Sequence, residues 1–313
     1  MGLRNKDLLT IHDLTVGEVA TILDVAKKLK RKQKAGEPHQ YLKGKTLAML
    51  FSKASTRTRT SFEVGFWQLG GHPIYLSDSA SQIGRGEPIR DTARVLSRMV
   101  DGIMIRTFGH DRVEEFAKWS DVPVINALTD LLHPCQVLTD LLTIQEHKGK
   151  NLKGLKMAYV GDGNNMTNSL FVIGAILGGT VMSVCPKGWG PDAQIFSEAQ
   201  EIAKKTGAKL TVTDRVEDAA GYDVAYTDTW VSMGDNTPLD AVRARYMPYQ
   251  INRELLKKTG IPYVLHCQPA HRGYEITDDV MDDEKVSLIY DEAENRLHAQ
   301  MAVLGTLISD KNK

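Results

Sequence analysis

The feature that most constrains the fold of this chain is a repeated alternation of short apolar runs with longer amphipathic runs. The short runs are rich in β-branched residues and predict buried strands, whereas the longer runs have apolar residues at helical spacing. Strands and helices in alternation are typical of a parallel sheet covered by helices. The expected strands are 45–53, 72–77, 102–106, 122–126, 155–161, 180–185, 209–213, 224–227 and 262–266.

The first helical run has the clearest boundaries. Thr15 and Glu18 have the spacing of a capping box, and Gly36 ends the run. The other helical runs are read from the same periodicity of apolar residues. The expected helices are 14–34, 61–69, 91–99, 112–119, 133–148, 166–177, 192–206 and 293–309.

The alternation stops and restarts at a charged, glycine-containing stretch, HKGKNLKG. A chain of 313 residues is long for one core and suits two domains of about 150 residues each. We therefore expect two parallel-sheet α/β domains, 1–147 and 148–291, with an active-site cleft between them.

Composition excludes several classes of protein. Lys+Arg and Asp+Glu both number 39, so no overall charge attracts nucleic acid or an anionic membrane. The three cysteines, Cys135, Cys185 and Cys267, form no CxxC pair and no metal-ligand spacing, which favours a reducing compartment. No run approaches the ~20 apolar residues of a membrane span, and the N-terminus lacks the apolar core of a signal peptide. We expect a cytoplasmic protein.

The segment Ser-Thr-Arg-Thr-Arg at 55–59 lies between an expected strand and an expected helix. Free N–H groups at the start of a helix bind anions, and arginine pairs with phosphate oxygens through two donors. The alternative is an ordinary capped helix with solvated arginines. The P-loop pattern is absent, so a nucleoside triphosphate is not indicated.

Other polar residues follow expected strands, where α/β sheets bind ligands. Arg106 ends one strand, His133 and Gln136 lie one turn apart at the start of a helix, and His-Cys-Gln-Pro at 266–269 ends another strand. Each has an ordinary structural interpretation alone, as a surface arginine, a capping histidine or a buried cysteine. Their shared placement indicates a ligand site.

Two other chemistries are disfavoured. Gly161 and Gly163 follow an expected strand, but Met166 occupies the third glycine position of a dinucleotide-binding motif. His266 and Cys267 are expected to point to opposite faces, as neighbours on a strand do, which excludes a base–nucleophile pair.

Together these motifs resemble the aspartate/ornithine carbamoyltransferase family over essentially the full chain. Residues 55–59, followed by Ser-Phe-Glu, resemble its carbamoyl-phosphate signature, and His-Pro-Cys-Gln at 133–136 resembles its second motif. Asp228 with Ser-Met-Gly at 232–234 resembles the motif of the ornithine branch. His-Cys-Gln-Pro resembles the family's His-Cys-Leu-Pro, with Gln268 in place of leucine.

The resemblance implies transfer of the carbamoyl group of carbamoyl phosphate to the δ-amine of L-ornithine, giving L-citrulline and phosphate, in arginine biosynthesis or another part of arginine metabolism. Carbamoyl phosphate is already activated, so we expect no metal and no cofactor. The first domain would bind carbamoyl phosphate and be completed by the C-terminal helix 292–313, and the second would bind ornithine. A homotrimer, or a multiple of trimers, is also implied.

The resemblance assigns roles to individual residues. Arg106, His133 and Cys267 would be catalytic, and Gln82 would reach the phosphate bound to a neighbouring subunit. The implied carbamoyl-phosphate-binding residues are Ser55, Thr56, Arg57, Thr58, Gln82, Arg106, His133, Gln136, Cys267, Gln268 and Arg296, and the implied ornithine-binding residues are Asn165, Asp228, Ser232 and Met233.

Three sister activities and one different class remain as alternatives. Ser-Met-Gly at 232–234 disfavours aspartate as the acceptor, and Asp228 would lack its α-amine partner if the acceptor were putrescine. An N-acylated ornithine is disfavoured because the ornithine motif is intact. The alternative from a different class is a catalytically silent binding protein of the same fold.

Overall fold

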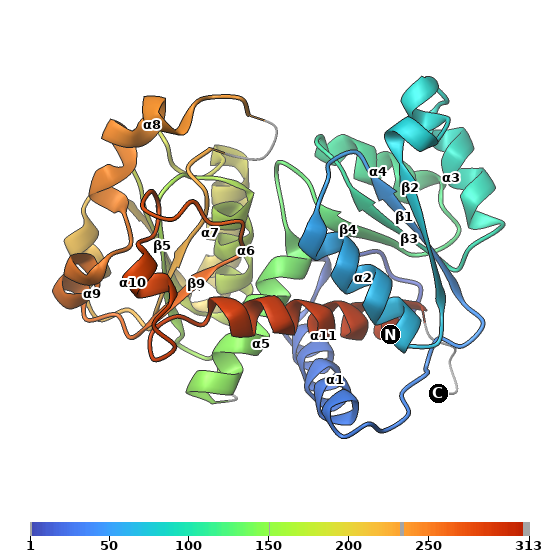
Figure 1. The fold of residues 1–313 in the computed structure, drawn as a ribbon, viewed down its shortest axis with the longest axis horizontal. Coiled ribbons are helices and arrows are strands. Elements are labelled where there is room, and N and C mark those ends of the chain that lie inside the picture. The colour runs from blue at the N-terminus through green and yellow to red at the C-terminus, as the bar shows by residue number, and fades with distance from the viewer. Residues whose placement is uncertain (1, 150, 232–234, 309–313) are drawn as a thin grey trace. The chain divides into compact units, whose positions relative to one another are not determined.

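The computed structural model describes residues 2–149, 151–231 and 235–308. The chain divides into two compact units, here called the first unit, Met1–Leu142 with Glu294–Lys313, and the second unit, Thr143–Ala293. Each unit contains a sheet of parallel strands flanked by helices (Figure 1). The predicted fold class of two parallel-sheet α/β domains is confirmed.

The sheet of the first unit has the order β2-β1-β3-β4. Strands β3 and β4 are buried along their whole length, as expected for a parallel sheet covered on both faces, whereas the edge strand β2 is partly exposed. After β2 the chain continues on the other side of β1, so β1 and β3 border a topological switch point. The strands are β1 (Thr46–Phe51), β2 (His72–Ser77), β3 (Gly102–Arg106) and β4 (Val124–Leu128).

The sheet of the second unit has the order β7-β6-β5-β8-β9, and all its pairs are parallel. Here the switch point lies between β5 and β8, because β6 and β7 extend the sheet in one direction and β8 and β9 in the other. The strands are β5 (Lys156–Val160), β6 (Thr180–Val184), β7 (Lys209–Thr213), β8 (Val224–Thr227) and β9 (Tyr263–His266).

The longer helices agree with the predicted ones to within a few residues, except for one start. The capping box is confirmed: the Thr15 N–H donates to the Glu18 carboxylate at 2.8 Å, and the Glu18 N–H donates to Thr15 Oγ1 at 3.2 Å. These helices are α1 (Val16–Lys34), α2 (Thr56–Gln68), α3 (Ile89–Ser97), α4 (His110–Trp119), α5 (Pro134–Lys148), α6 (Asn165–Leu177), α7 (Ala193–Thr206) and α11 (Ile289–Ile308).

The predicted start of α2 at residue 61 is wrong, because the helix begins at Thr56. The Ser55 side chain caps the helix. The first turn consists of polar residues, so the periodicity of apolar residues does not reveal it. Three short helices were also missed, since none of them is long enough to display that periodicity. They are α8 (Leu239–Tyr246), α9 (Arg253–Thr259) and α10 (Asp278–Met281).

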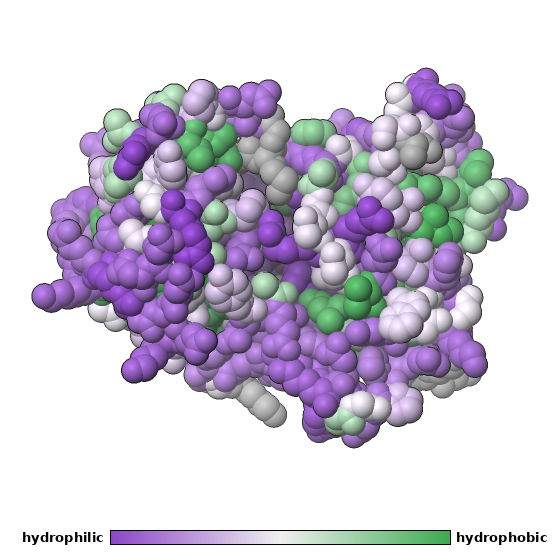
Figure 2. Space-filling model, in the orientation of Figure 1, coloured by the Kyte–Doolittle hydropathy of each residue, from purple (hydrophilic) through white to green (hydrophobic). Residues whose placement is uncertain are grey.

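The face drawn in Figure 2 is mostly hydrophilic, but hydrophobic residues gather over part of the first unit, near β2 and α3. Several large apolar side chains of this unit are exposed, including Met99 at 72% and Trp67 at 70%. None of the helices in the described residues has both the length and the apolar character that crossing a bilayer requires.

Candidate active site

The carboxyl ends of neighbouring strands bring the predicted anion-binding motifs together in the first unit. β1 pairs with β3 up to Phe51↔Arg106, and the Ser52 N–H donates to the Arg106 carbonyl at 2.9 Å. The segment 55–59 therefore begins three residues after Ser52, which is hydrogen-bonded to Arg106. β4 pairs with the other side of β3 and leads into residues 133–136, where α5 begins.

Ser55 positions the first turn of α2. Its Oγ accepts the Thr58 N–H at 3.1 Å, so Thr56, Arg57 and Thr58 form the first helical turn. Helix geometry leaves the N–H groups of Thr56 and Arg57 without intrahelical acceptors, and the helix dipole makes this end positive. The predicted signature is therefore itself the start of a helix, where an anion binds.

Two buried guanidinium groups meet at the Thr58 hydroxyl. Arg106 Nη1 donates to Thr58 Oγ1 at 3.1 Å, and Arg296 Nη2 donates to the same atom at 3.3 Å. Arg106 is 2% exposed and Arg296 is 5% exposed. Two guanidinium groups around one hydroxyl, at the positive end of a helix dipole, form a site that favours an anion.

His133 is a neutral imidazole in this arrangement. Its Nε2 lies 3.2 Å from Arg296 Nη2, and because a guanidinium only donates, we assign the His133 proton to Nδ1. Burial lowers the pKa of His133 well below its usual value, and the positive charges of Arg296 and Arg106 lower it further. His133 can therefore donate a hydrogen bond at neutral pH without carrying charge.

The amide of Gln136 is oriented by two charged neighbours. Its Oε1 accepts from Arg296 Nη1, and its Nε2 donates to Asp140 Oδ1 at 2.8 Å. Arg296 consequently contacts Thr58, His133 and Gln136 at once. The carbonyl oxygen of Gln136 is the group that can accept a hydrogen bond from an NH₂ group of a ligand.

The two arginines of the signature differ in their surroundings. Arg59 is exposed, and its Nε lies 3.0 Å from Glu63 Oε2, while its guanidinium lies over the Tyr75 ring. Arg57 is half-buried and makes no ion pair with the described residues. Gln82 is exposed, and its side chain forms no hydrogen bond to the part of the chain described here, so this structure does not bring it to the group around Thr58.

The second unit has a corresponding group at the carboxyl ends of its central strands. Asp228 follows β8 and is buried; its Oδ2 accepts from Asn164 Nδ2 at 2.9 Å, and its Oδ1 accepts the Thr229 N–H at 2.8 Å. Asn164 also caps α6 through its Oδ1. The predicted Asn165 is half-buried and is the first residue of α6.

Burial raises the pKa of Asp228, whereas the neighbouring His266 and hydrogen bonds from Thr229, Cys267 and Asn164 lower it in part. A cationic ligand would stabilise the ionised carboxylate against this cost of burial. The predicted ornithine-site residues Ser232 and Met233 lie outside the described residues.

The predicted separation of His266 and Cys267 is wrong. β9 ends at His266, so strand alternation does not extend to Cys267. Ligand atoms of Asp228, His266 and Cys267 all lie within 4.8 Å of one another. His266 is nonetheless unsuited to be a base for the thiol, because its Nδ1 accepts the Gln268 N–H at 2.9 Å and its Nε2 lies 3.2 Å from Glu275 Oε1.

The same three residues have the chemistry of metal ligands. Their ligand atoms are close enough to share one metal ion, and no other such group occurs among the described residues. A metal bound through His266 would have to displace the hydrogen bond at Nδ1 or at Nε2. The arrangement therefore favours a hydrogen-bonded network over a metal centre.

Four polar residues of the second unit were not predicted from the sequence: Asn164, Thr229, His271 and Glu275. Asn164 had a readable signal, because an asparagine just before an apolar helical run is a preferred cap. Glu275 had none, since its partner His266 is at the end of a strand and no spacing rule connects the two.

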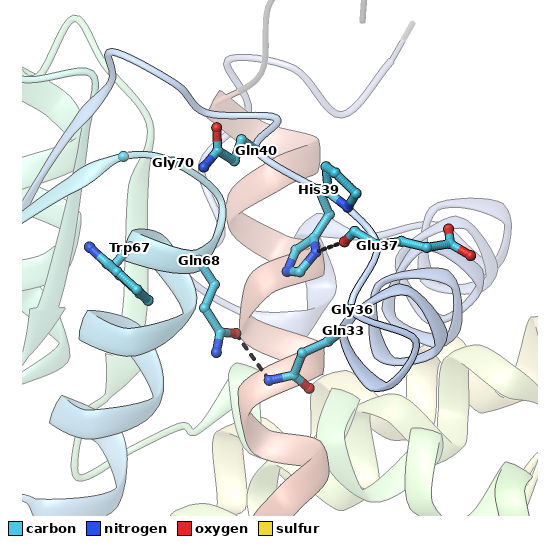
Figure 3. A pocket seen from close by; sticks show the side chains of 10 residues that line it. Gln33, Gly36, Glu37, His39, Gln40, Trp67, Gln68 and Gly70 are labelled. Atoms are coloured by element: carbon cyan, nitrogen blue, oxygen red, sulfur yellow. Dashed lines mark hydrogen bonds between the residues drawn. The ribbon is translucent and has the colours of Figure 1, made fainter.

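An open pocket of about 520 Å³ lies in the first unit beside the ends of α1 and α2 (Figure 3). Gln33 Nε2 donates to Gln68 Oε1 at 3.2 Å within it, and Trp67 lines another side. Its lining includes Glu37 but neither lysine nor arginine. It lacks the positive charge that a phosphate requires, and it contains none of the predicted site residues.

Comparison with known proteins matches both halves of the chain to one family. Residues 6–146 match the model of the aspartate/ornithine carbamoyltransferase carbamoyl-P binding domain, and residues 153–307 match that of the Asp/Orn binding domain.

Individual relatives match over nearly the full length. The ornithine carbamoyltransferase of Carboxydothermus hydrogenoformans is 53% identical over 308 residues, covering 97% of this chain and 98% of its own. That of Halalkalibacterium halodurans is 54% identical over 311 residues, covering 98% and 97%. The structure of the ornithine carbamoyltransferase from Pyrococcus furiosus superposes with a TM-score of 0.93 at 47% identity, covering 98% of each chain. The chain belongs to the aspartate/ornithine carbamoyltransferase family.

Proposed function

We propose that the protein transfers the carbamoyl group of carbamoyl phosphate to the δ-amine of L-ornithine, releasing L-citrulline and phosphate. The observation that carries the proposal is the convergence of Arg106 and Arg296 on Thr58, at a helix N-terminus and beside His133. Relatives about half identical to this chain over nearly its full length are named ornithine carbamoyltransferases, which supports ornithine as the acceptor.

The phosphate of carbamoyl phosphate would bind at the start of α2. Ser55, Thr56, Arg57 and Thr58 supply backbone N–H groups, hydroxyls and a guanidinium, and charge-assisted hydrogen bonds to phosphate are the stronger kind. The half-buried Arg57, without a carboxylate partner among the described residues, would neutralise part of the dianion.

The carbonyl oxygen of carbamoyl phosphate would be polarised by Thr58, Arg106 and His133. The lone pair of the neutral δ-amine attacks the carbonyl carbon, a C–N bond forms, and the carbonyl oxygen becomes an oxyanion. The oxyanion then re-forms the carbonyl as the bond to the phosphate oxygen breaks, and the proton lost by the amine passes to the departing phosphate. Donors already aimed at the oxyanion stabilise the transition state electrostatically. Gln136 would bind the carbamoyl NH₂ group, and Arg296 would hold both ends of the substrate.

The residues of the second unit would recognise ornithine. Asp228 would pair with the α-amino group, and Asn165, Ser232 and Met233 would bind the rest of the α-amino-acid end. Cys267 and the backbone carbonyl of residue 268 would line the reaction centre. The ionised Asp228, whose pKa is raised by burial, gains from a cationic partner, which supports this role.

The first expected result is acceptor selectivity. A citrulline assay with ornithine should give a kcat/KM at least ~10²-fold above that measured with putrescine, which lacks the α-amino-acid end and leaves buried polar groups unpaired. In an assay of phosphate release, aspartate and N-acetylornithine should be turned over no better than putrescine. Equal use of ornithine and putrescine would contradict the ornithine assignment, and no turnover of any amine would favour a silent binding protein.

We further propose that the active form is a homotrimer in which Gln82 serves a neighbouring subunit. The exposed position of Gln82 and the exposed apolar side chains of the first unit support a subunit contact there. The cytoplasm is proposed as the location because cysteines are sparse, and arginine metabolism as the pathway because of the substrates.

Mixing two inactive variants should test the shared site. Arg106→Ala and Gln82→Ala chains, refolded together in equal amounts, should recover about one quarter of the active sites, because a random trimer supplies both intact residues to one site in four. The control mixes Arg106→Ala with His133→Ala. Both residues belong to the part of the site that one chain supplies, so this mixture should recover no activity. A fully active monomer in sedimentation, or recovery in both mixtures, would contradict a site completed by Gln82.

A further inference from the structure

A fully buried carboxylate in the second unit has no role in the proposed chemistry. Glu275 lies in the turn between β9 and α10 (Figure 1), and its side chain is 0% exposed. Its Oε1 accepts two hydrogen bonds, one from His266 Nε2 at 3.2 Å and one from the His271 N–H. Its Oε2 forms no hydrogen bond within the described residues. One oxygen therefore links the last residue of β9, His266, to His271 in the loop that follows the strand.

The first of these contacts determines the tautomer of His266. The Gln268 N–H donates to His266 Nδ1 at 2.9 Å, so Nδ1 must be without a proton. The imidazole proton then lies on Nε2, where it is donated to Glu275. A proton on Nδ1 instead would face the Gln268 N–H and break that bond. Glu275 thus selects the tautomer that can hold Gln268.

Gln268 needs such support because its backbone is unusual. Its φ is +56°, a left-handed conformation that residues other than glycine rarely adopt. Such a conformation persists only where the surrounding contacts determine it. The backbone carbonyl of this residue is the group proposed to line the reaction centre. The hydrogen bond from Gln268 to His266 therefore orients a functional carbonyl.

The second contact of Glu275 leads to the ornithine-binding carboxylate. His271, whose N–H donates to Glu275, places its Nδ1 2.9 Å from Thr229 Oγ1. The Thr229 N–H donates to Asp228 Oδ1 at 2.8 Å. Glu275 is thus connected to Asp228 through His271 and Thr229, and to Gln268 through His266.

We propose that Glu275 is a positioning residue for the amine-recognising half of the site: its single oxygen, bonded to His266 and His271, fixes the Gln268 carbonyl and the Asp228 carboxylate together. The inference rests on the proposed roles of Gln268 and Asp228. It predicts that an acceptor oxygen at this point is essential and that its negative charge is not.

The test compares variants that separate the acceptor from the charge. Glu275→Met keeps the length but removes the acceptor, and it should lower kcat/KM for ornithine by ~10², the scale of a small misplacement of a reacting group. Glu275→Gln retains an oxygen that can accept both bonds, and it should stay within about tenfold of the wild type, since it loses only the charge on a hydrogen bond. Glu284→Met, at an exposed glutamate of the same unit, is the matched control and should be unchanged.

Two further measurements distinguish positioning from a general loss of structure. The affinity for inorganic phosphate, which the first unit is proposed to bind, should change less than about twofold in all variants, an amount well below one hydrogen bond. Thr229→Val removes the hydroxyl that contacts His271 and donates to the Val231 carbonyl, but it keeps the N–H that donates to Asp228. It should raise the KM for ornithine while the thermal midpoint stays near that of the wild type. If Glu275→Met is as active as Glu284→Met, or if Glu275→Gln loses as much as Glu275→Met, the inference is overturned.

The tautomer provides a readout that does not depend on activity. In the wild-type protein labelled with ¹⁵N-histidine, His266 should show a protonated Nε2 and an unprotonated Nδ1, and this pattern should be lost in Glu275→Met. A protonated Nδ1 in the wild type overturns the inference even if the proposed reaction is confirmed. Absence of citrulline formation by the wild type, with the predicted tautomer present, would instead count against the proposed function alone.

Discussion

Replacing Arg106 by alanine should lower kcat/KM for carbamoyl phosphate by at least ~10³, the largest effect expected in the molecule. Losing one donor to a developing oxyanion costs about 10²–10³ in rate, and losing a charge-assisted contact to phosphate adds roughly 1.5–3 kcal/mol. We propose that Arg106 bridges the carbonyl oxygen and the phosphate of carbamoyl phosphate, and so makes both contacts. It is almost completely buried beside Thr58, so no solvent-borne cation can replace it.

The neighbouring arginines provide graded controls for this measurement. Arg57→Ala removes a half-buried guanidinium from the phosphate end only and should cost about 10², or two to three kcal/mol. Arg59→Ala removes an exposed guanidinium that pairs with Glu63, and an exposed pair contributes at most about 1 kcal/mol, so activity should remain within severalfold. Arg106→Lys and far-UV circular dichroism test whether the fold survives. Arg106→Ala within tenfold of the wild type would rule out the assignment.

Asp228→Asn should have the second-largest effect, a fall of ~10² or more in kcat/KM for ornithine. The substitution keeps the shape but removes the charge proposed to pair with the α-amino group, and a broken buried ion pair is strongly destabilising to the complex. Phosphate affinity should be unchanged, because the groups at the start of α2 remain intact. The ratio of kcat/KM for ornithine to that for putrescine should also fall in Asp228→Asn. An unchanged ratio would show that Asp228 does not recognise the α-amino group.

The pH dependence of this residue has opposite signs for binding and for stability. Because burial raises the pKa of Asp228 above 3.8, the folded protein takes up a proton that the unfolded chain still lacks as the pH falls toward 3.8. The contribution of Asp228 to the free energy of unfolding is therefore greatest below 3.8, and it decreases as the pH rises through the folded-state pKa. Ornithine recognition needs the ionised form and is lost as the pH falls. Urea unfolding of Asp228→Asn at neutral pH should consequently show no large loss of stability.

Much of the architecture could be predicted because its signals are local. The start of α1 followed from Thr15 and Glu18, whose reciprocal hydrogen bonds span three residues. The strands β3 and β8 agree with their predicted limits because each is a short, mostly apolar run bounded by polar residues. The start of α2 was misplaced because a capped turn of serine, threonine and arginine has no apolar periodicity.

The sequence by itself determined which motifs are present and that they lie at the carboxyl ends of strands. It did not determine which of their atoms meet. Arg296 and Thr58 are 238 residues apart in the chain, and their contact depends on how α11 packs within the first unit. The neutral state of His133 and the raised pKa of Asp228 depend on burial and on neighbouring charges, which only the folded chain creates. The hydrogen bonds that Glu275 accepts from His266 and His271 likewise require a turn whose path no residue spacing encodes, because tertiary packing rather than local propensity sets it.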